Sequence, residues 1–373
     1  MRTARLGNEI IDLNKLTRSE LMRLKNRRDF FCTHCHKPVI FKNGTRKRAH
    51  FSHEKKGIFT TNPESSAHIL VKHAMVKWLK KQGVNAEVEK RFPSIDRIAD
   101  VYFENENARF ALEIQKSPMS DIEFNQRRLD YHSIGMTVIW IFLGEIGENN
   151  TKFQLPPVMI GRETERLLHF CVKNAQLHIF ENPIFLTTRD IYAQPLRGKL
   201  NQFTIKDLTD KKGESMHFDT EWLEIKKQFR KRGWFYASKS EKKLLEQCLI
   251  RGFNLSLLPT EIGWPVSGNG IRKSLFVWQA YVLIILMKYF NPTATFLLQD
   301  IMSLMMSEYQ VANTQSAQKQ VLAYLKWLAM FGIVTTDKAS FKYIKNPKIV
   351  TTMEQGLERD RKFVEVVEKL WKQ

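Results

Sequence analysis

Two cysteines and two histidines near the N-terminus have the spacing of a zinc site. Cys32 and Cys35 form a C-x2-C pair. His50 and His53 form an H-x2-H pair, and fourteen residues separate the two pairs. Two thiolates and two imidazoles at this loop length complete the tetrahedral shell that zinc prefers in structural sites. Because protein fills all four positions, the sequence predicts a structural zinc ion with no open position for a substrate.

Aromatic residues beside these ligands are expected to form a minimal core around the ion: Phe30, Phe31, Phe41 and Phe51. The alternative is a surface loop with reactive cysteines. A basic triplet between the two pairs has the chemistry to bind nucleic-acid phosphates: Arg46, Lys47 and Arg48. A solvated basic turn explains the triplet nearly as well, so both interpretations remain open.

A second group of residues that could do chemistry consists of acids in strand-like segments. Asp100 and Glu113 each stand between two apolar residues, and Gln115 shares the face of Glu113 because strand side chains alternate. Carboxylates are disfavoured in strand interiors, and two on neighbouring strands repel each other unless a positive charge lies between them. A divalent cation would resolve that conflict, since Mg²⁺ binds through one or two carboxylates. The alternative is that Glu113 and Gln115 lie on the wet face of a half-exposed sheet.

The segments around these acids predict a compact α/β unit. A helix is expected from Asn62, which can cap it, to Gly83, which ends it, with apolar residues at three- and four-residue steps. Glu64 falls on the inward face of this helix. A second helix is predicted over 119–133. With the strand candidates, the order is αβββαβ: "AEVEKRF", "DRIADVYF", "RFALEIQ" and, after the second helix, "TVIWIFL".

The D-V…E-I-Q pattern in an αβββαβ core resembles the PD-(D/E)xK nuclease superfamily. Together with the preceding C-x2-C…H-F-x-H segment, the chain resembles the competence protein CoiA family over essentially its full length. The resemblance implies an N-terminal zinc-binding segment, a restriction-endonuclease-like middle and a helical C-terminal region. It also implies a role in natural transformation of Gram-positive bacteria, where incoming single-stranded DNA is recombined into the chromosome. The family has also been labelled a competence transcription factor.

By this resemblance, Asp100 matches the motif's Asp, Glu113 its second acid and Glu64 the first-helix acid. Gln115 takes the position that is usually Lys, which makes the motif E-x-Q and leaves it without that positive charge. Arg127 and Tyr131 resemble an R-x3-Y pair that would contact the DNA backbone. An ordinary amphipathic helix with solvated basic residues is the alternative for that pair.

The rest of the chain is less clearly patterned. The expected parts are a zinc-binding module over 1–57, a nuclease-like domain over 58–150, a mixed and then helical region over 151–290, and a C-terminal region over 291–373. Two helices and a hairpin between 291 and 349 suggest a winged-helix-like unit. In "KKQFRKRGWFY", beginning at Lys226, cations stand beside aromatic rings. This combination suits single-stranded nucleic acid, and a core position explains the aromatic residues equally well.

Composition limits the partners and the compartment. The 373 residues carry 59 Lys and Arg against 39 Asp and Glu, a formal net charge of +20. Such an excess favours nucleic acid as partner, with an anionic membrane surface second. The N-terminus lacks the apolar stretch of a signal peptide, and no segment is long and apolar enough to insert into a membrane. With no disulfide framework, a reducing cytoplasm is expected.

These observations predict a Mg²⁺- or Mn²⁺-dependent DNA nuclease, or a nuclease-like factor, that processes single-stranded or branched DNA beside recombination proteins. Two alternatives remain open. One is a non-catalytic DNA-binding or recombinase accessory factor, for which the E-x-Q motif is the reason. The other is a transcription factor that acts through the tail.

Overall fold

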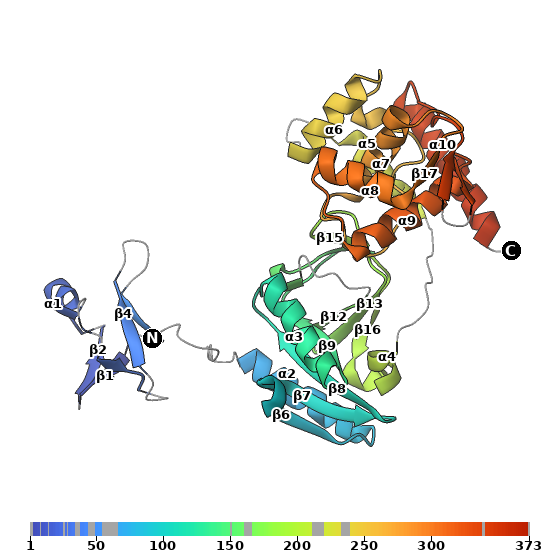
Figure 1. Ribbon diagram of the computed structural model, residues 1–373. Helices are drawn as coiled ribbons and strands as arrows, with labels where there is room; N and C mark the ends of the chain where they lie inside the picture. Colours follow the sequence, from blue (N-terminus) through green and yellow to red (C-terminus); the bar gives the residue numbers. More distant parts are fainter. Residues whose placement is uncertain are drawn as a thin grey trace. The chain divides into compact units, whose positions relative to one another are not determined.

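The computed structural model (Figure 1) describes residues 3–7, 9–13, 15–24, 27, 29–33, 38–43, 49–53, 66–149, 151–159, 166–210, 220–232, 239–337 and 340–371. The chain divides into two compact units, Met1–Ser65 and Ser66–Gln373. Glu64, Cys35 and the triplet 46–48 lie outside the described residues, so their predicted roles are not observed.

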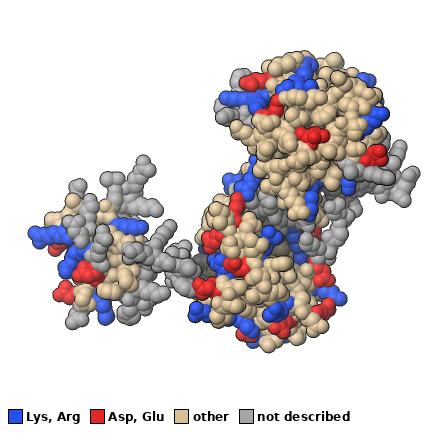
Figure 2. Space-filling view, in the orientation of Figure 1, with Lys and Arg blue, Asp and Glu red and all other residues tan. Residues whose placement is uncertain are grey.

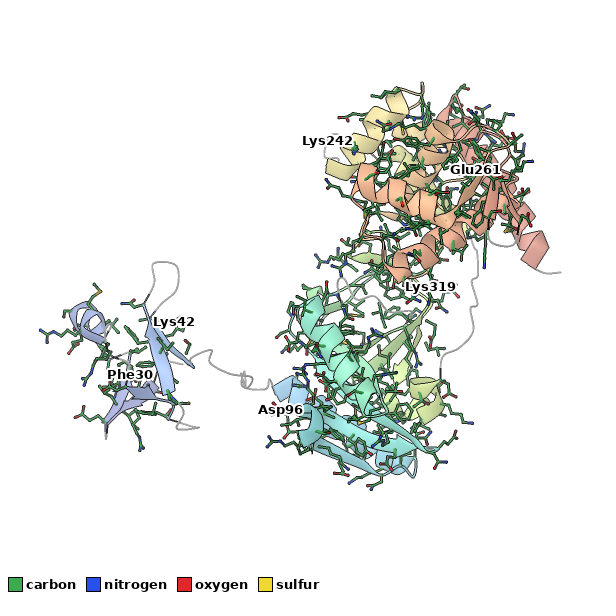
Figure 3. The ribbon with its side chains drawn as sticks, in the orientation of Figure 1. Phe30, Lys42, Asp96, Lys242, Glu261 and Lys319 are labelled. Carbon is green, nitrogen blue, oxygen red and sulfur yellow. The ribbon has the colours of Figure 1, made fainter. Side chains whose placement is uncertain are left out.

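The first unit is built on a five-stranded sheet with the order β2-β1-β3-β4-β5. Phe30 lies inside this unit (Figure 3), with ring centroids 4.9 Å from Phe51 and 6.5 Å from Phe41. These three rings form the expected core, but Phe31 is 41% exposed because side chains alternate along a strand. The elements are β1 (Thr3–Leu6), β2 (Glu9–Asp12), α1 (Arg18–Arg23), β3 (Phe30–Phe31), β4 (Pro38–Lys42) and β5 (His50–His53).

The second unit begins with elements in the predicted αβββαβ order. Gly83 and Gly135, which were expected to end the two helices, follow them with positive φ angles of 78° and 69°. The elements are α2 (Ser66–Lys81), β6 (Ala86–Phe92), β7 (Arg97–Asn105), β8 (Ala108–Gln115), α3 (Asp121–Ser133) and β9 (Met136–Leu143).

Helices α2 and α3 cover opposite faces of the sheet that these strands form (Figure 1). Val71 and its neighbours on α2 pack against Leu112 and Ile114, whereas Tyr131 on α3 packs against Ala111. Strand β8 therefore alternates between two apolar layers, as expected for a sheet that is covered on both sides.

The sheet does not end at residue 150, where sequence analysis ended this domain. Strand β12 (Arg166–Cys171) pairs in parallel with β9 and continues the sheet to seven strands in the order β16-β13-β12-β9-β8-β7-β6. The added strands bury one face against the same core as α2. The remaining elements of this part are β13 (Gln176–Glu181), β16 (Leu196–Lys199), α4 (Ile205–Thr209), and a four-stranded sheet of β10 (Gly147–Asn149), β11 (Lys152–Gln154), β14 (Ile184–Phe185) and β15 (Asp190–Tyr192).

The C-terminal part is mostly helical and packs around α7 (Leu275–Tyr289), whose residues from Leu275 to Leu286 are all buried. None of the helices within the described ranges has the length and apolar composition needed to cross a membrane. The other elements are α5 (Thr220–Lys231), α6 (Lys239–Leu249), β17 (Thr295–Leu297), α8 (Leu298–Tyr309), α9 (Gln315–Met330), β18 (Val334–Asp337), β19 (Ser340–Tyr343) and α10 (Met353–Trp371).

The predicted pair of helices and hairpin in the tail are α8, α9 and β18–β19. Strand β17 joins the hairpin, so that the sheet has the order β17-β19-β18. This arrangement has the elements that a winged-helix-like unit requires, and that assignment stays a prediction.

The basic stretch that begins at Lys226 does not present all its cations to solvent. Lys226 Nζ lies 3.1 Å from Asp360 Oδ1, and Arg230 Nε lies 2.7 Å from Asp360 Oδ2, with all three side chains 3% exposed or less. Arg230 also donates to the carbonyl oxygen of Leu258 at 2.7 Å. These two cations therefore attach α5 to α10. They are not available to nucleic acid, and residues 234–236 of the stretch lie outside the described ranges.

Replacing Asp360 by Asn should destabilise the protein strongly. The change leaves two buried cations without their negative partner, which costs about 3–5 kcal/mol. A fall in Tm of the full-length chain would measure it. Glu358→Gln is the control, since Glu358 lies two residues away in an exposed pair with Lys362 and its loss should change Tm little. Equal Tm values for the two variants would contradict a role for the buried network.

Candidate active site

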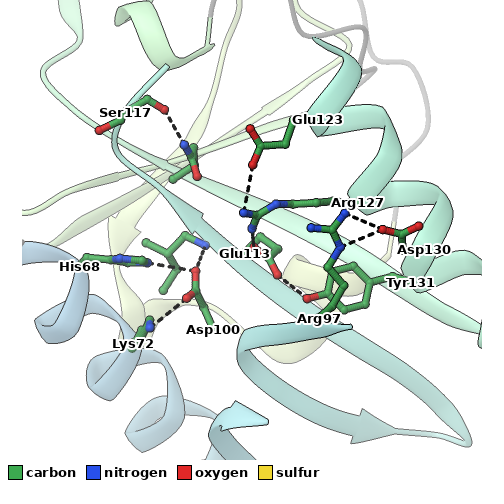
Figure 4. Close-up of polar contacts among 12 residues, drawn as sticks. His68, Lys72, Arg97, Asp100, Glu113, Ser117, Glu123, Arg127, Asp130 and Tyr131 are labelled. Carbon is green, nitrogen blue, oxygen red and sulfur yellow. Dashed lines mark hydrogen bonds and ion pairs between the residues drawn. The ribbon is translucent and has the colours of Figure 1, made fainter. Parts of the chain in front are cut away.

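The candidate site lies where the pairing between strands β7 and β8 ends. Their ladder ends at the pair Val101 and Leu112, so Asp100 and Glu113 occupy the next opposed positions. There the backbone N–H of Ile114 donates to Asp100 Oδ2 at 2.8 Å instead of to a strand neighbour. The Asp100 carboxylate thus fills the gap between the strands (Figure 4).

Two side chains of α2 bind the Asp100 carboxylate. His68 Nε2 lies 3.0 Å from Oδ2 and Lys72 Nζ lies 2.9 Å from Oδ1. The two residues are four apart, so they share one face of the helix. Burial acts to raise the pKa of Asp100. The hydrogen bond and charge of His68, the Ile114 N–H and the Lys72 charge outweigh burial and hold that pKa below its ordinary value.

Glu113 is held from the other face of the sheet by α3. Tyr131 Oη donates to Glu113 Oε1 at 2.5 Å, and Arg127 Nη1 donates to Oε2 at 2.8 Å. The side chain of Glu113 is 3% exposed. Burial, followed by the charge of Asp100, raises the pKa of Glu113 to about 7, although Arg127 and Tyr131 act in the opposite direction. The two acids are therefore close enough to repel each other.

Protein side chains place a positive charge beside each acid. Lys72 offsets Asp100, and Arg127 offsets Glu113 (Figure 4). Tyr131 is fully buried, which corrects the expectation that it contacts DNA directly: its hydroxyl is committed to Glu113. Arg127 is 27% exposed and binds both Glu113 and Glu123.

The side chain of Gln115 bonds to the backbone just after β8 and does not belong to this charge network. Its Nε2 donates to the carbonyl oxygen of Ser117 at 2.5 Å. The amide therefore stabilises the turn after β8, and the motif position that is usually Lys brings no charge to the site.

Sequence reasoning missed Lys72 and Glu89. Lys72 Nζ lies 2.9 Å from Glu89 Oε1 as well as from Asp100. The ladder between β6 and β7 is interrupted at Glu89: Val88 pairs with Val101 and Lys90 pairs with Ala99, so Glu89 and Asp100 occupy opposed positions in the same register, where the regular pairing is broken. Lys72 follows the buried Val71 on the inward part of α2, and a lysine at such a position was the available signal.

The donor chemistry of this site suits a hard divalent cation. The Lys72 ammonium already marks a position where two carboxylates stabilise a positive charge. Mg²⁺ and Mn²⁺ favour carboxylate oxygens, and Mg²⁺ usually keeps several waters or phosphate oxygens as well. As the side chains stand, the part of the chain that the structure describes contains no group of three or more His, Cys, Asp or Glu side chains able to hold a metal ion. A cation shared by Asp100 and Glu113 therefore has to displace Lys72 or Arg127.

The predicted zinc ligands are described only in part. Cys32 follows β3 and is 3% exposed, and His50 begins β5. For His53 only the backbone is described, as the last residue of β5. The zinc site stays a prediction.

Helix α9, which a winged helix would place in a DNA groove, is largely buried. The segment 261–271 covers it, and Glu261 in that segment lies among the C-terminal helices (Figure 3). Three side chains of α9 bond to this segment: Gln320 accepts from Ile271 N at 2.8 Å, Tyr324 donates to Glu261 O at 3.0 Å, and Trp327 donates to Pro265 O at 3.0 Å. The exposed residues of α9 are Gln315, Lys319, Lys326 and Met330.

Three family models match consecutive parts of the chain. They are described as competence protein CoiA, N-terminal domain, over residues 13–57; nuclease-like domain, over residues 64–213; and C-terminal domain, over residues 218–356. The chain belongs to the CoiA competence protein family. No curated protein matches the chain. The nuclease-like match of this CoiA family member includes both acids and all seven strands of the central sheet.

The raised pKa of Glu113 predicts a pH-dependent stability that Glu113→Gln abolishes. Because the folded-state pKa is near 7 and the ordinary value is 4.5, the buried carboxyl favours folding when protonated, and this stability is lost as the pH rises through 7. Between pH 5 and pH 8 the stability of the wild type relative to Glu113→Gln should fall by about 1–3 kcal/mol. Thermal unfolding across this range, without added divalent metal, measures the difference.

Glu123→Gln is the control for this measurement. It removes the exposed acid that binds the same arginine, so any change caused by Arg127 alone will occur in both variants. Parallel pH profiles for the wild type and Glu113→Gln would show that the Glu113 carboxyl titrates as in an unfolded chain.

Proposed function

We propose that this protein is a Mg²⁺- or Mn²⁺-dependent phosphodiesterase that processes single-stranded or branched DNA during recombination in natural transformation. The observation that carries the proposal is the meeting of Asp100 and Glu113 where β7 and β8 part. Membership of the family whose middle domain is described as nuclease-like supports it.

The proposed reaction is hydrolysis of one phosphodiester bond. A water oxygen bonds to phosphorus, the bond from phosphorus to one deoxyribose oxygen breaks, and a proton from the water ends on that oxygen, so the two products end in a phosphate and a hydroxyl group. Asp100 and Glu113 would hold the metal ion, with Glu64 as the supporting first-helix acid. When bound, the ion supplies Lewis acidity, which lowers the pKa of water and offsets charge on the phosphate. Arg127 and Tyr131 orient Glu113 from the face of the sheet that α3 covers.

The basic character of the chain supports DNA as the partner. The net charge is +20, and the visible face in Figure 2 intermixes basic and acidic side chains. A surface that binds the DNA backbone therefore need not be one continuous basic groove. The triplet Arg46, Lys47 and Arg48 on the zinc-binding loop is proposed as an additional phosphate contact, and recombination proteins are proposed as partners.

A second candidate is a non-catalytic DNA-binding or recombinase accessory factor. Two observations favour it: protein cations already offset both acids, and Gln115 brings no charge. Under this function the nuclease-like domain is a scaffold. We do not propose the transcription-factor function, because the buried acids Asp100 and Glu113 have no purpose under it.

Cleavage by purified protein tests the proposed function. Single-stranded, flapped and four-way DNA are incubated with the protein in Mg²⁺ or Mn²⁺, and the cleavage products are quantified by gel electrophoresis. Removing a metal ligand should lower the cleavage rate by about 100-fold or more, so Asp100→Asn and Glu113→Ala should be nearly inactive while most DNA affinity remains.

Glu87→Gln is the matched control, since Glu87 lies on neighbouring β6 in an exposed pair with Lys90. It should cleave as the wild type does. DNA binding without cleavage on every substrate, in either metal, would favour the accessory function. Equal cleavage by Glu113→Ala and the wild type would refute the assignment of Glu113.

We propose further that Cys32, Cys35, His50 and His53 bind one structural zinc ion. The burial of Cys32 beside the aromatic core supports this ligand set. Elemental analysis of the purified chain should give about one zinc per chain, and Cys32→Ser should lose it and lower the Tm. Cys171→Ser, at a half-buried cysteine of β12, should keep the zinc.

A further inference from the structure

The E-x-Q motif leaves the proposed site without the lysine that usually follows the second acid. The Gln115 amide donates to the Ser117 carbonyl oxygen, so this position contributes a hydrogen bond to a turn and no charge. A positive charge for the phosphate has to come from another element of the fold.

Lys72 is the cation closest to the more accessible acid. Its Nζ lies 2.9 Å from Asp100 Oδ1, and its side chain is 3% exposed. Asp100 is 15% exposed against 3% for Glu113, so a substrate approaches on the side of Asp100. Lysine is rarely buried without a partner, because removing an ammonium group from water costs several kcal/mol. Two carboxylates, from Asp100 and Glu89, offset that cost.

The backbone of β6 is distorted at the residue that binds Lys72 from outside. Glu89 has φ of 55° within a strand, in the left-handed region that is unfavourable for a residue with a Cβ. Glu89 lies opposite Asp100 where the ladder is interrupted, and its carboxylate reaches Lys72 at 2.9 Å. A regular strand would direct the side chain elsewhere, so the distortion and the ion pair belong together.

Arg127 is a poorer source of this charge. It lies on the α3 face, where it binds Glu113 at 2.8 Å and Glu123 at 3.3 Å. Glu113 is the less accessible of the two site acids, and Tyr131 closes the site on that face of the sheet.

We propose that Lys72, held by Glu89 at the distorted position in β6, supplies the positive charge that the E-x-Q motif lacks. This inference rests on the proposed phosphodiesterase function. Lys72 is a positioning residue: it fixes Asp100 in the gap between β7 and β8 and places a positive charge beside the scissile phosphate. Glu89 keeps the ammonium from leaving the site when DNA or a metal ion competes for Asp100.

A charge-relocation experiment tests the inference. Cleavage rates are compared for wild type, Lys72→Met, Gln115→Lys and the double variant, with Lys77→Met, on the exposed side of α2, as the control. Lys72→Met should slow cleavage by about ten-fold or more at saturating DNA. Gln115→Lys should restore the double variant to within about three-fold of the wild type, because it returns a cation to the motif position two residues after Glu113. Lys77→Met should behave as the wild type.

Rescue separates a role in charge from a role in folding. If Lys72 only supports the fold, a lysine at position 115 on β8 cannot replace it, and an inactive double variant overturns the inference. Wild-type cleavage by Lys72→Met also overturns it and leaves the phosphodiesterase function standing, provided that Glu113→Ala is inactive. If the wild type cleaves no substrate in either metal, the proposed function fails and this inference fails with it.

Two further measurements keep the test decisive. Should Lys72→Met fail to fold, Glu89→Gln replaces it, because Glu89 is 56% exposed and its loss frees Lys72 without opening the core. Its cleavage should fall, and Gln115→Lys should restore it. Independently of cleavage, Mn²⁺ binding to the DNA-free protein should tighten by about three-fold or more in Lys72→Met, because a competing cation is removed. Unchanged Mn²⁺ affinity would mean that the ammonium is not at the metal-binding carboxylates.

Discussion

The central part of this protein depends on one electrostatic constraint: two carboxylates that lie next to each other in a largely buried place need positive charge on both sides. The fold meets it by parting β7 from β8, so that Asp100 enters the gap between the strands, and by covering the sheet with a helix on each face. Helix α2 brings Lys72 to one acid, and α3 brings Arg127 to the other. Removing either helix would leave a buried acid without its counter-charge.

Local sequence patterns predicted most of the central fold. The helix periods, the glycines after α2 and α3 and the apolar strands of 86–143 depend on neighbours within a few residues. The sheet beyond residue 150 was harder to predict, because β12 joins it through parallel pairing with β9, and a parallel pairing leaves no turn signal between the two strands. The same limit applies to segment 261–271, which covers α9 through bonds to side chains some fifty residues away.

For the site, the acids were easier to predict than their partners. Asp100 and Glu113 stand out because carboxylates are unusual between apolar strand residues. A buried lysine cannot be told by residue type from a solvated helix lysine, and the role of Glu89 depends on a local backbone distortion opposite Asp100. The basic stretch from Lys226 suggested a nucleic-acid surface for a related reason. Lys226 and Arg230 look like a nucleic-acid surface until Asp360, 130 residues further on, is brought against them.

The short strands after the central sheet join two parts that are separate in sequence. Ile184, Leu186 and Tyr192 belong to the same apolar cluster as the C-terminal helices, and Leu275 N donates to Leu186 O at 3.1 Å. The family's nuclease-like and C-terminal regions, matched separately over 64–213 and 218–356, thus share one apolar cluster in this chain. A fragment cut between them would expose apolar surface on both halves, so the two regions are expected to unfold together.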